Sequence, residues 1–375
     1  MEQTYMKEQP ILNLLLKMSL PMVVSMLVNS LYNIVDSFFV AKISENAMTA
    51  LSLVFPVQNL INAVMIGFGI GINAVISFYL GAADQKKADQ AASQGMLLGT
   101  FHGILLMIIC LVVIHPFLSL FTNDAEIVNL GLRYSKIVFL FSVFFAWELV
   151  FEKVFQAVGK MNISMICLMS GCLVNIFLDP VLIFGIGPFP VLRVTGAAIA
   201  TVIAQMIVTV MFFIFAMKDT VLFQYVRYLK KPDLHHMKGI VRIGFPTSVQ
   251  SMLFTGISMI IARLVAGYGD AAVAVQKVGS QIESISWMTA DGFAAAVNSF
   301  TSQNHGAGKK RRIYQGYVSA LKVVFVWGIF CTLLLICCPA PVFRIFITEK
   351  DVIPLGVDYL RILGVSQLFM SLEIT

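Results

Sequence analysis

The sequence predicts an all-α polytopic membrane protein made of two six-helix lobes that are related by an internal repeat, the second of them incomplete. Three observations support this fold class. Of the 375 residues, 58% are hydrophobic and 12% are charged, with a mean hydropathy of +0.86, well above that of a soluble domain. Charged residues separate apolar blocks of about 20 to 30 residues, the length of a helix that crosses a bilayer. A shift of 225 positions also aligns the two halves of the chain.

Ten apolar spans follow one another along the chain. Helices fit these blocks better than barrel strands do, because a membrane strand needs only about ten residues. The predicted spans are 12–40, 47–80, 91–120, 127–158, 161–186, 196–217, 239–267, 271–303, 313–338 and one that starts near 352.

Basic residues concentrate on alternate connections between these spans. Connections rich in Lys and Arg stay in the cytoplasm, whereas "TNDAE" at 122–126 and "GYGD" at 267–270 are poorer in cations and are expected outside. We therefore expect a multi-pass protein of the inner (cytoplasmic) membrane with a cytoplasmic amino terminus. The basic connections contain Lys7 and Lys17, Lys86 and Lys87, Lys153 and Lys160, residues 218–242, and "KKRR" at 309–312.

The repeat divides the chain into two parts. The shift of 225 places "GFGIGINAVISFYLGA" from Gly67 on "GFAAAVNSFTSQNHGA" from Gly292, and Pro21 on Pro246. Six spans separate equivalent points, so the halves have the same orientation and are related by an axis along the membrane normal. A second half equal to the first would need about 70 more residues, so we expect a truncated chain; a complete ten-helix protein is the alternative. The predicted parts are a six-helix lobe at 1–218, a cytoplasmic linker at 219–238, and a second lobe at 239–375 with helices 7 to 9 and part of helix 10.

The stretch "NIFLDPVLIFGIG" places a carboxylate inside a membrane span. Asp179 follows Asn175 by four residues, so both lie on one helical face and the amide can donate to the carboxyl group. Pro180 lacks an N–H and leaves the carbonyl of Ile176 without its helical partner, which predicts a bend. Because a charge in the membrane is costly and usually functional, this group predicts a proton or sodium site.

The first span repeats this pattern in "LYNIVDSFF". Tyr32 and Asn33 precede Asp36 by four and three residues and are expected on its side of the helix. Asp36 and Asp179 could share a cavity, and if they do, desolvation and mutual repulsion favour proton uptake. The alternative is that Asp36 merely ends its helix near the outer interface. Its repeat equivalent is Ile261, so the ion site would belong to the first lobe alone.

Two further sets of polar residues lie within spans. Glu283, Trp287 and Asp291 are spaced at i, i+4 and i+8 and could line a substrate cavity for organic cations; the alternative is one charge near each interface and a packed Trp. Glu148 and Glu152 lie one turn apart, beside Lys153 as a possible partner. Since Glu373 repeats Glu148, a structural role is favoured for that pair.

No cofactor, metal site or catalytic set is predicted. The six Cys and five His show no metal-ligand spacing, and the chain lacks a "GxxxxGK" phosphate loop. We therefore expect no enzyme, and transport energy from an ion gradient or from the substrate's own gradient.

With these motifs in view, the chain resembles the multidrug and toxic compound extrusion (MATE) transporters, in particular their bacterial DinF-like and MepA-like members. The resemblance runs from about Leu14 to the end and rests on "LYNIVDSFFVA", "GFGIGINAVISFYLGA", "NIFLDPVLIFGIG", "TGAAIATVIAQ", "GFPTSVQ" and "SQNHGAGKKRR". It implies twelve helices in two lobes and export of cationic amphipathic compounds in exchange for H+ or Na+. The residues that match the family's ion site are Asp36, Asn175, Asp179, Tyr32 and Thr201.

The resemblance implies small organic cations and the bilayer as partners, no nucleic acid, and a monomer. The chain departs from the family in its missing end and in Arg193, which lies in a connection that is usually short and glycine-rich. Three rival functions stay open: a lipid-linked oligosaccharide flippase of the same superfamily, an intramembrane enzyme, and a ten-helix channel. A flippase would need cationic residues in its cavity to meet a pyrophosphate, whereas this cavity is predicted to be acidic.

Overall fold

The computed structural model describes residues 5–219, 222, 231–346 and 352–375, and all regular structure in these ranges is helical. Seven of the described helices are long and apolar enough to cross a membrane, which confirms the predicted fold class. The helices are α1 (Tyr5–Glu8), α2 (Ile11–Ala41), α3 (Glu45–Gly81), α4 (Gln85–Phe121), α5 (Ala125–Leu140), α6 (Ser142–Ala157), α7 (Met161–Phe184), α8 (Val194–Lys218), α9 (Leu234–Ala266), α10 (Asp270–Gly306), α11 (Lys310–Cys337), α12 (Pro339–Arg344) and α13 (Ile353–Ile374).

Polar side chains cap the first turns of several long helices. Ser44 accepts a hydrogen bond from the backbone N–H of Ala47 at the start of α3, and Asp84 does the same for α4 with Lys87. Such caps satisfy backbone donors that have no partner inside the helix. Pro21 in α2 and Pro180 in α7 lie inside helices that continue past them.

Some predicted boundaries were wrong. The span 127–158 is two helices, α5 and α6, that meet at Phe141. At this break the Ser142 hydroxyl donates to the carbonyl of Gly103 on α4 at 3.1 Å, a long-range contact that periodicity does not reveal. α9 begins at Leu234, so the end of the predicted 219–238 linker is helical; residues 220–221 and 223–230 of that linker lie outside the described part.

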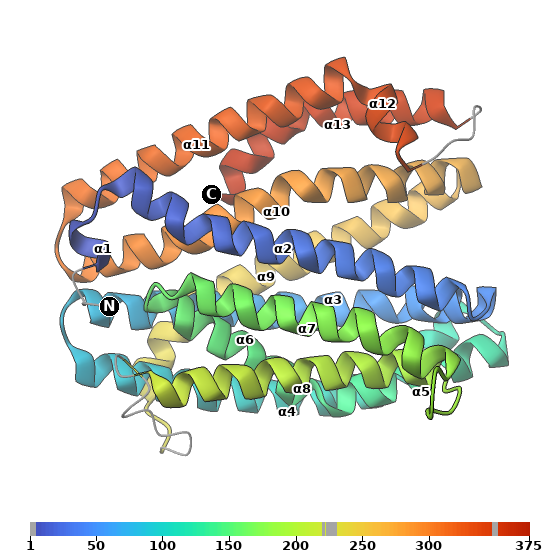
Figure 1. Cartoon of the computed structure of the whole chain (residues 1–375), viewed down its shortest axis with the longest axis horizontal. Coiled ribbons are helices and arrows are strands. Elements are labelled where there is room, and N and C mark those ends of the chain that lie inside the picture. The colour runs from blue at the N-terminus through green and yellow to red at the C-terminus, as the bar shows by residue number, and fades with distance from the viewer. Residues whose placement is uncertain (1–4, 220–221, 223–230, 347–351) are drawn as a thin grey trace.

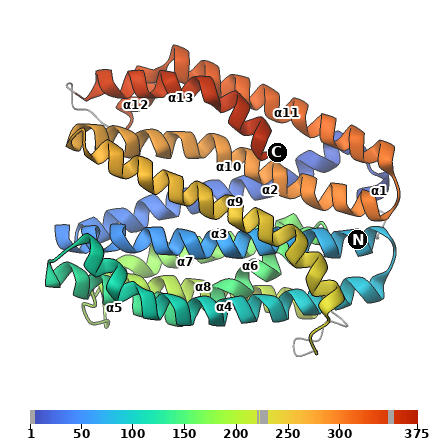
Figure 2. The same cartoon turned by 180° about the vertical axis from the view of Figure 1, so that it is seen from behind.

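The long helices run side by side along the long axis of the molecule (Figure 1). We call the end that carries Lys86, Lys87 and residues 309–312 the basic end. Helices α3 to α8 gather on one side and α10 to α13 on the other, and we call these groups the first and second lobes, with α2 assigned to the first and α9 to the second by chain order. Figure 2 shows the same two groups from behind.

The first helix of each lobe crosses to the other lobe. α9 packs against α3 over its first half and then runs beside α10 (Figures 1 and 2). α2 packs on α10 of the second lobe as well as on α7 of the first. Beyond the middle of α9, Leu253, Phe254 and Ile257 are exposed, and an added Cβ on Gly256 would touch nothing. The lobes therefore meet at the basic end and separate toward the opposite end.

The contacts between the lobes join residues that are related by the 225-residue repeat. Asn298 donates to its own equivalent, Asn73, at 3.1 Å. A Cβ on Gly81 would collide with the carbonyl of Gln303, and a Cβ on the equivalent Gly306 would collide with the carbonyl of Phe78, the equivalent of Gln303. Such reciprocal contacts arise where two equivalent elements meet on a two-fold axis, so the repeat seen in the sequence is also the symmetry of the interface.

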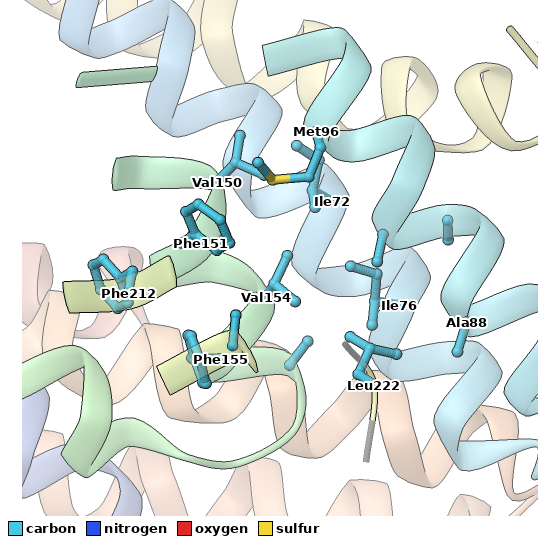
Figure 3. Close-up of a cluster of buried hydrophobic side chains, with 14 of the residues drawn as sticks. Ile72, Ile76, Ala88, Met96, Val150, Phe151, Val154, Phe155, Phe212 and Leu222 are labelled. Carbon is cyan, nitrogen blue, oxygen red and sulfur yellow. The ribbon is translucent and has the colours of Figure 1, made fainter. Parts of the chain in front are cut away.

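Large aromatic side chains fill the core of the first lobe. Phe151 and Phe155 of α6 stack on Phe212 of α8, with ring centroids 6.2 and 5.7 Å apart. Ile72 and Ile76 of α3 face the same cluster (Figure 3). This packing fixes α6 against α3 and α8, and it thereby fixes the polar groups that α6 carries.

Candidate functional site

Helices α2, α7 and α8 bring the predicted ion-site residues together inside the first lobe. Asp179 is fully buried, Asn175 is 2% exposed and Thr201 is 8% exposed. Asp36 reaches them from α2, which packs against α7. Its helix continues to Ala41, so Asp36 lies within the helix and does not end it.

The amide of Asn175 connects α7 with α8. In the orientation that satisfies both of its ends, Nδ2 donates to Asp179 Oδ2 at 2.7 Å, and Oδ1 accepts from the backbone N–H of Thr201 at 3.2 Å. The Thr201 hydroxyl donates to the carbonyl of Ala197 at 3.0 Å. The expected contact between Asn175 and Asp179, one turn apart on α7, is thus present.

The carboxyl groups of Asp36 and Asp179 lie close enough to interact with each other. One oxygen of each, Asp36 Oδ1 and Asp179 Oδ1, is enclosed and has no donor among the described residues. Because an ionised carboxylate only accepts hydrogen bonds, these two groups can bond to each other only if one of them carries a proton. The geometry therefore offers a place for one exchangeable positive charge.

Two tyrosines surround this carboxyl pair. The hydroxyl of Tyr32, on α2, lies near Thr201 and both carboxyl groups. Tyr134 of α5 reaches Thr201 and Gln58 of α3. Tyr134 and Gln58 were not predicted, because each is a single polar residue on its own span, and only the packing of α3 and α5 brings them to the site.

Asn33 does not join the site. Its Nδ2 donates to the carbonyl and the side chain of Asn29 at 2.9 Å each, one turn back on α2, and the residue is exposed. Asn33 is within about 60° of Asp36 around the helix, but because its amide bonds back to Asn29, the shared side does not bring it into the site. Ile261, the repeat equivalent of Asp36, is exposed on α9.

The three residues predicted to line a substrate cavity point to different neighbours. Glu283 accepts a hydrogen bond of 3.4 Å from Gln367 of α13, within the second lobe. Asp291 lies in electrostatic range of Lys153 on α6 of the first lobe, and Trp287, between them, is half-buried. Eight residues turn a helix by about 80° beyond two full turns, which separates the two carboxyl groups. Asp291 is the member that reaches the lobe contact.

Lys153 is a buried cation. The prediction that it lies in a basic cytoplasmic connection was wrong. It is 8% exposed, and its Nζ donates to Glu152 Oε1 at 3.0 Å and to Gln156 Oε1 at 3.3 Å. The expected pairing with a neighbouring carboxylate is therefore present. Glu148, one turn away, has an enclosed Oε2 without a described partner, whereas its equivalent Glu373 is exposed, so the two do not share one environment.

The chemistry of the described residues favours the binding of a small cation over a group-transfer reaction. Around Asp36 and Asp179 there are carboxyl, amide and hydroxyl oxygens, which serve proton and sodium sites in transporters. Among the described ranges, no cluster of three or more His, Cys, Asp or Glu residues is arranged to hold a metal ion.

The comparisons with known proteins cover nearly the whole chain. The MatE family model matches residues 21–181 and 246–375. The "Probable multidrug resistance protein NorM" of Thermotoga maritima is 27% identical over 368 residues, which is 96% of this chain and 78% of that protein. The "Multidrug export protein MepA" of Staphylococcus aureus is 25% identical over 361 residues, again 96% of this chain and 78% of that protein. A solved structure of the outward-facing conformation of a multidrug resistance MATE family transporter of the MOP superfamily matches with a TM-score of 0.89 at 25% identity, over 98% of this chain and 82% of that chain.

Proposed function

The chain belongs to the MatE family, and we propose that it is an antiporter that exports organic cations in exchange for H+ or Na+ by alternating access. Its relatives are transporters and not enzymes. The observation that carries the proposal is the buried pair Asp36 and Asp179, whose facing carboxyl groups need a proton or a cation between them.

The coupling argument rests on the two arrangements that alternating access requires. A ligand moves such an equilibrium only by the difference between its affinities for the two states. The coupling ion binds at Asp36 and Asp179, with Asn175 and Thr201 as supporting partners, whereas the substrate binds between the lobes. Each ligand then favours a different arrangement, and this difference couples their movements.

The class of substrate follows from the relatives and from the charge of the lobe contact. The names of NorM and MepA describe multidrug resistance and multidrug export. In this chain, Asp291 at the lobe contact supplies negative charge, and Trp287, one turn away on α10, supplies an aromatic ring that can face an organic cation.

The same proposal sets the orientation in the membrane. The basic end faces the cytoplasm of a bacterial cell by the positive-inside rule, so the amino terminus lies in the cytoplasm of an inner-membrane protein. The lobes separated at the opposite end are then open to the outside. We propose that the protein works as a monomer, with 1–218 and 239–375 as the moving lobes and 219–238 as their linker.

Uptake of a fluorescent organic cation into everted membrane vesicles tests this function. A pH gradient and a sodium gradient are imposed separately, and the gradient that drives uptake identifies the coupling ion. Asp179→Asn is expected to abolish gradient-driven uptake, while Asp358→Asn, which changes an exposed carboxylate on α13, is expected to leave it unchanged. Full gradient-driven uptake by the Asp179→Asn variant would contradict the assignment.

A lipid-linked oligosaccharide flippase is the alternative that one observation favours, because Lys153 places a cation near the lobe contact. The Lys153 ammonium already donates hydrogen bonds to Glu152 and Gln156, and Asp291 lies in its electrostatic range, so the local balance of charge is negative. A drug-resistance assay beside a cell-wall precursor assay separates the two functions. A channel is separated by whether uptake saturates and proceeds against the gradient of the dye.

A further inference from the structure

Lys153 is a cation inside the membrane-spanning part of the chain, where a charge is costly and usually functional. Its backbone is fixed at the lobe contact, because its carbonyl accepts from Asn73 Nδ2 at 3.1 Å. The same Asn73 bonds with Ser299 and Asn298 of α10 in the second lobe, at 3.0 and 3.1 Å. The backbone of Lys153 therefore lies directly beside the contact that closes the basic end.

The side chain of Lys153 extends from this contact toward the opposite end. It lies across Gly69 of α3, where an added Cβ would meet its Cγ. Gly69 is one turn before Asn73 on a helix that runs toward the basic end, so the lysine stem points away from that end. Its ammonium group consequently faces the side on which the lobes separate.

Asp291 approaches the same place from the second lobe. Its neighbour Gly292 packs directly on Val23 of α2, and Gln156, which binds the Lys153 ammonium, donates to Met22 Sδ at 3.5 Å on the same turn of α2. The lysine charge also acts electrostatically on Asp291. Glu152 of the first lobe thus pairs directly with the tethered ammonium, and Asp291 of the second lobe lies within its electrostatic range.

The charges of this group set how much positive charge it can accept. With Glu152 and Asp291 ionised beside one ammonium, and with the unpartnered carboxyl group of Glu148 neutral, the net charge is −2 + 1 = −1, so one organic monocation makes the group neutral and a dication leaves an excess charge. Uncompensated charge in a low-dielectric site is strongly unfavourable. We propose that Lys153 is a specificity-determining residue of the substrate space. Its ammonium group neutralises one of the two carboxylate charges and thereby restricts this space to monocations. This inference rests on the proposed function and names the charge class of its substrate.

Ethidium and propidium test this inference, because they share one aromatic ring system and carry one and two positive charges. Fluorescence anisotropy with the purified full chain in lipid nanodiscs gives the dissociation constant of each dye. The unsubstituted chain is expected to prefer ethidium. Lys153→Met is expected to move the affinity ratio toward propidium by about tenfold or more, as removal of one nearby charge requires.

Two matched variants control for net charge and for geometry. Lys322→Met removes one exposed lysine from α11 and is expected to keep the original ratio, as is Lys153→Arg, which keeps the charge. Lys153→Gln provides a second neutral variant that can still bond with Glu152 if Lys153→Met does not fold. An unchanged ratio in a folded neutral variant overturns the inference. Failure of both dyes to bind the unsubstituted chain overturns the proposed function, and the inference with it.

Discussion

Asn73→Ala is expected to weaken the closed basic end and shift the chain toward an arrangement that is open there. The Asn73 side chain bonds with Ser299 at 3.0 Å and with Asn298 at 3.1 Å across the lobe contact. Its bond to the carbonyl of Lys153 stays within one lobe and is lost equally in both arrangements. Only the two contacts across the lobes therefore affect the equilibrium between them.

The magnitude follows from the strength of such bonds in membranes. Side-chain hydrogen bonds between membrane helices contribute about 0.6 kcal/mol each on average, so the loss of two costs about 1 kcal/mol. This is about a five- to tenfold change in the equilibrium constant. Ser299→Ala leaves the bond between Asn73 and Asn298 intact, and the other bond of Ser299 goes to Ala295 on its own helix, so this variant is expected to cost about half as much. Ser77→Ala, whose contacts with Asn73 and Ala157 stay in the first lobe, is expected to change the equilibrium little.

Double electron–electron resonance measures this equilibrium directly. Spin labels replace Leu120 at the end of α4 and Tyr268 between α9 and α10, two exposed positions at the opposite end, in a chain without its six native cysteines. The population with a short distance between labels is expected to grow in the order Ser77→Ala, Ser299→Ala, Asn73→Ala. The same distance distribution in Asn73→Ala and in the unsubstituted chain would refute the reasoning.

Three further predictions concern the basic end. Gly306→Ala places a methyl group against a backbone carbonyl of α3, which is expected to disfavour the closed basic end by about 1–3 kcal/mol in the same spin-label experiment, whereas Gly256→Ala, in open space, changes nothing. Arg312→Gln removes donors to two carbonyls of the amino-terminal segment and is expected to speed amide exchange of residues 5–9 about tenfold, with unchanged exchange contradicting the anchoring role. The His236 side chain and the backbone N–H of His235 hold the pKa of Asp233 below its ordinary value. The stabilisation of the folded chain by these contacts is therefore present above the ordinary pKa and is lost as pH falls through the lowered pKa. In an NMR titration, His236→Ala should raise the pKa of Asp233, and an unchanged pKa would contradict this.

The order of the helices followed from apolar length alone, because only a helix satisfies its own backbone in a bilayer. The contact of Asn175 with Asp179 followed from their spacing on one helix. The residues alone left two interpretations of Asp36, a cavity shared with Asp179 or the end of its helix, since periodicity within one span does not say which helix packs beside it; the family resemblance favoured the first. Tyr134 gave no local signal for the same reason.

Lys153 shows where local reasoning fails. A lysine near the end of an apolar span is usually an anchor at the membrane surface, and its place among alternating basic connections supported that interpretation. Its burial depends on Asn73, on Glu152 and on the glycine at position 69 that leaves room for its stem. Two of these three lie 80 or more positions away in the chain, beyond the reach of any window on the sequence.

The helix α2 provides a physical connection between ion binding and the lobe contact. Its second half carries Asp36 to the buried carboxyl group of Asp179, and Met18 and Met22 in its first half pack in the cluster of Phe300 on α10. These parts are about 14 residues, or roughly 21 Å, apart on one helix. α9 has the equivalent contact with the other lobe but carries Ile261 in place of the aspartate. The lobe contact is therefore symmetric while the carboxyl pair is not. Under the proposed function, a cation at Asp36 would act on this contact through α2, and α9 carries no equivalent carboxylate through which to oppose it.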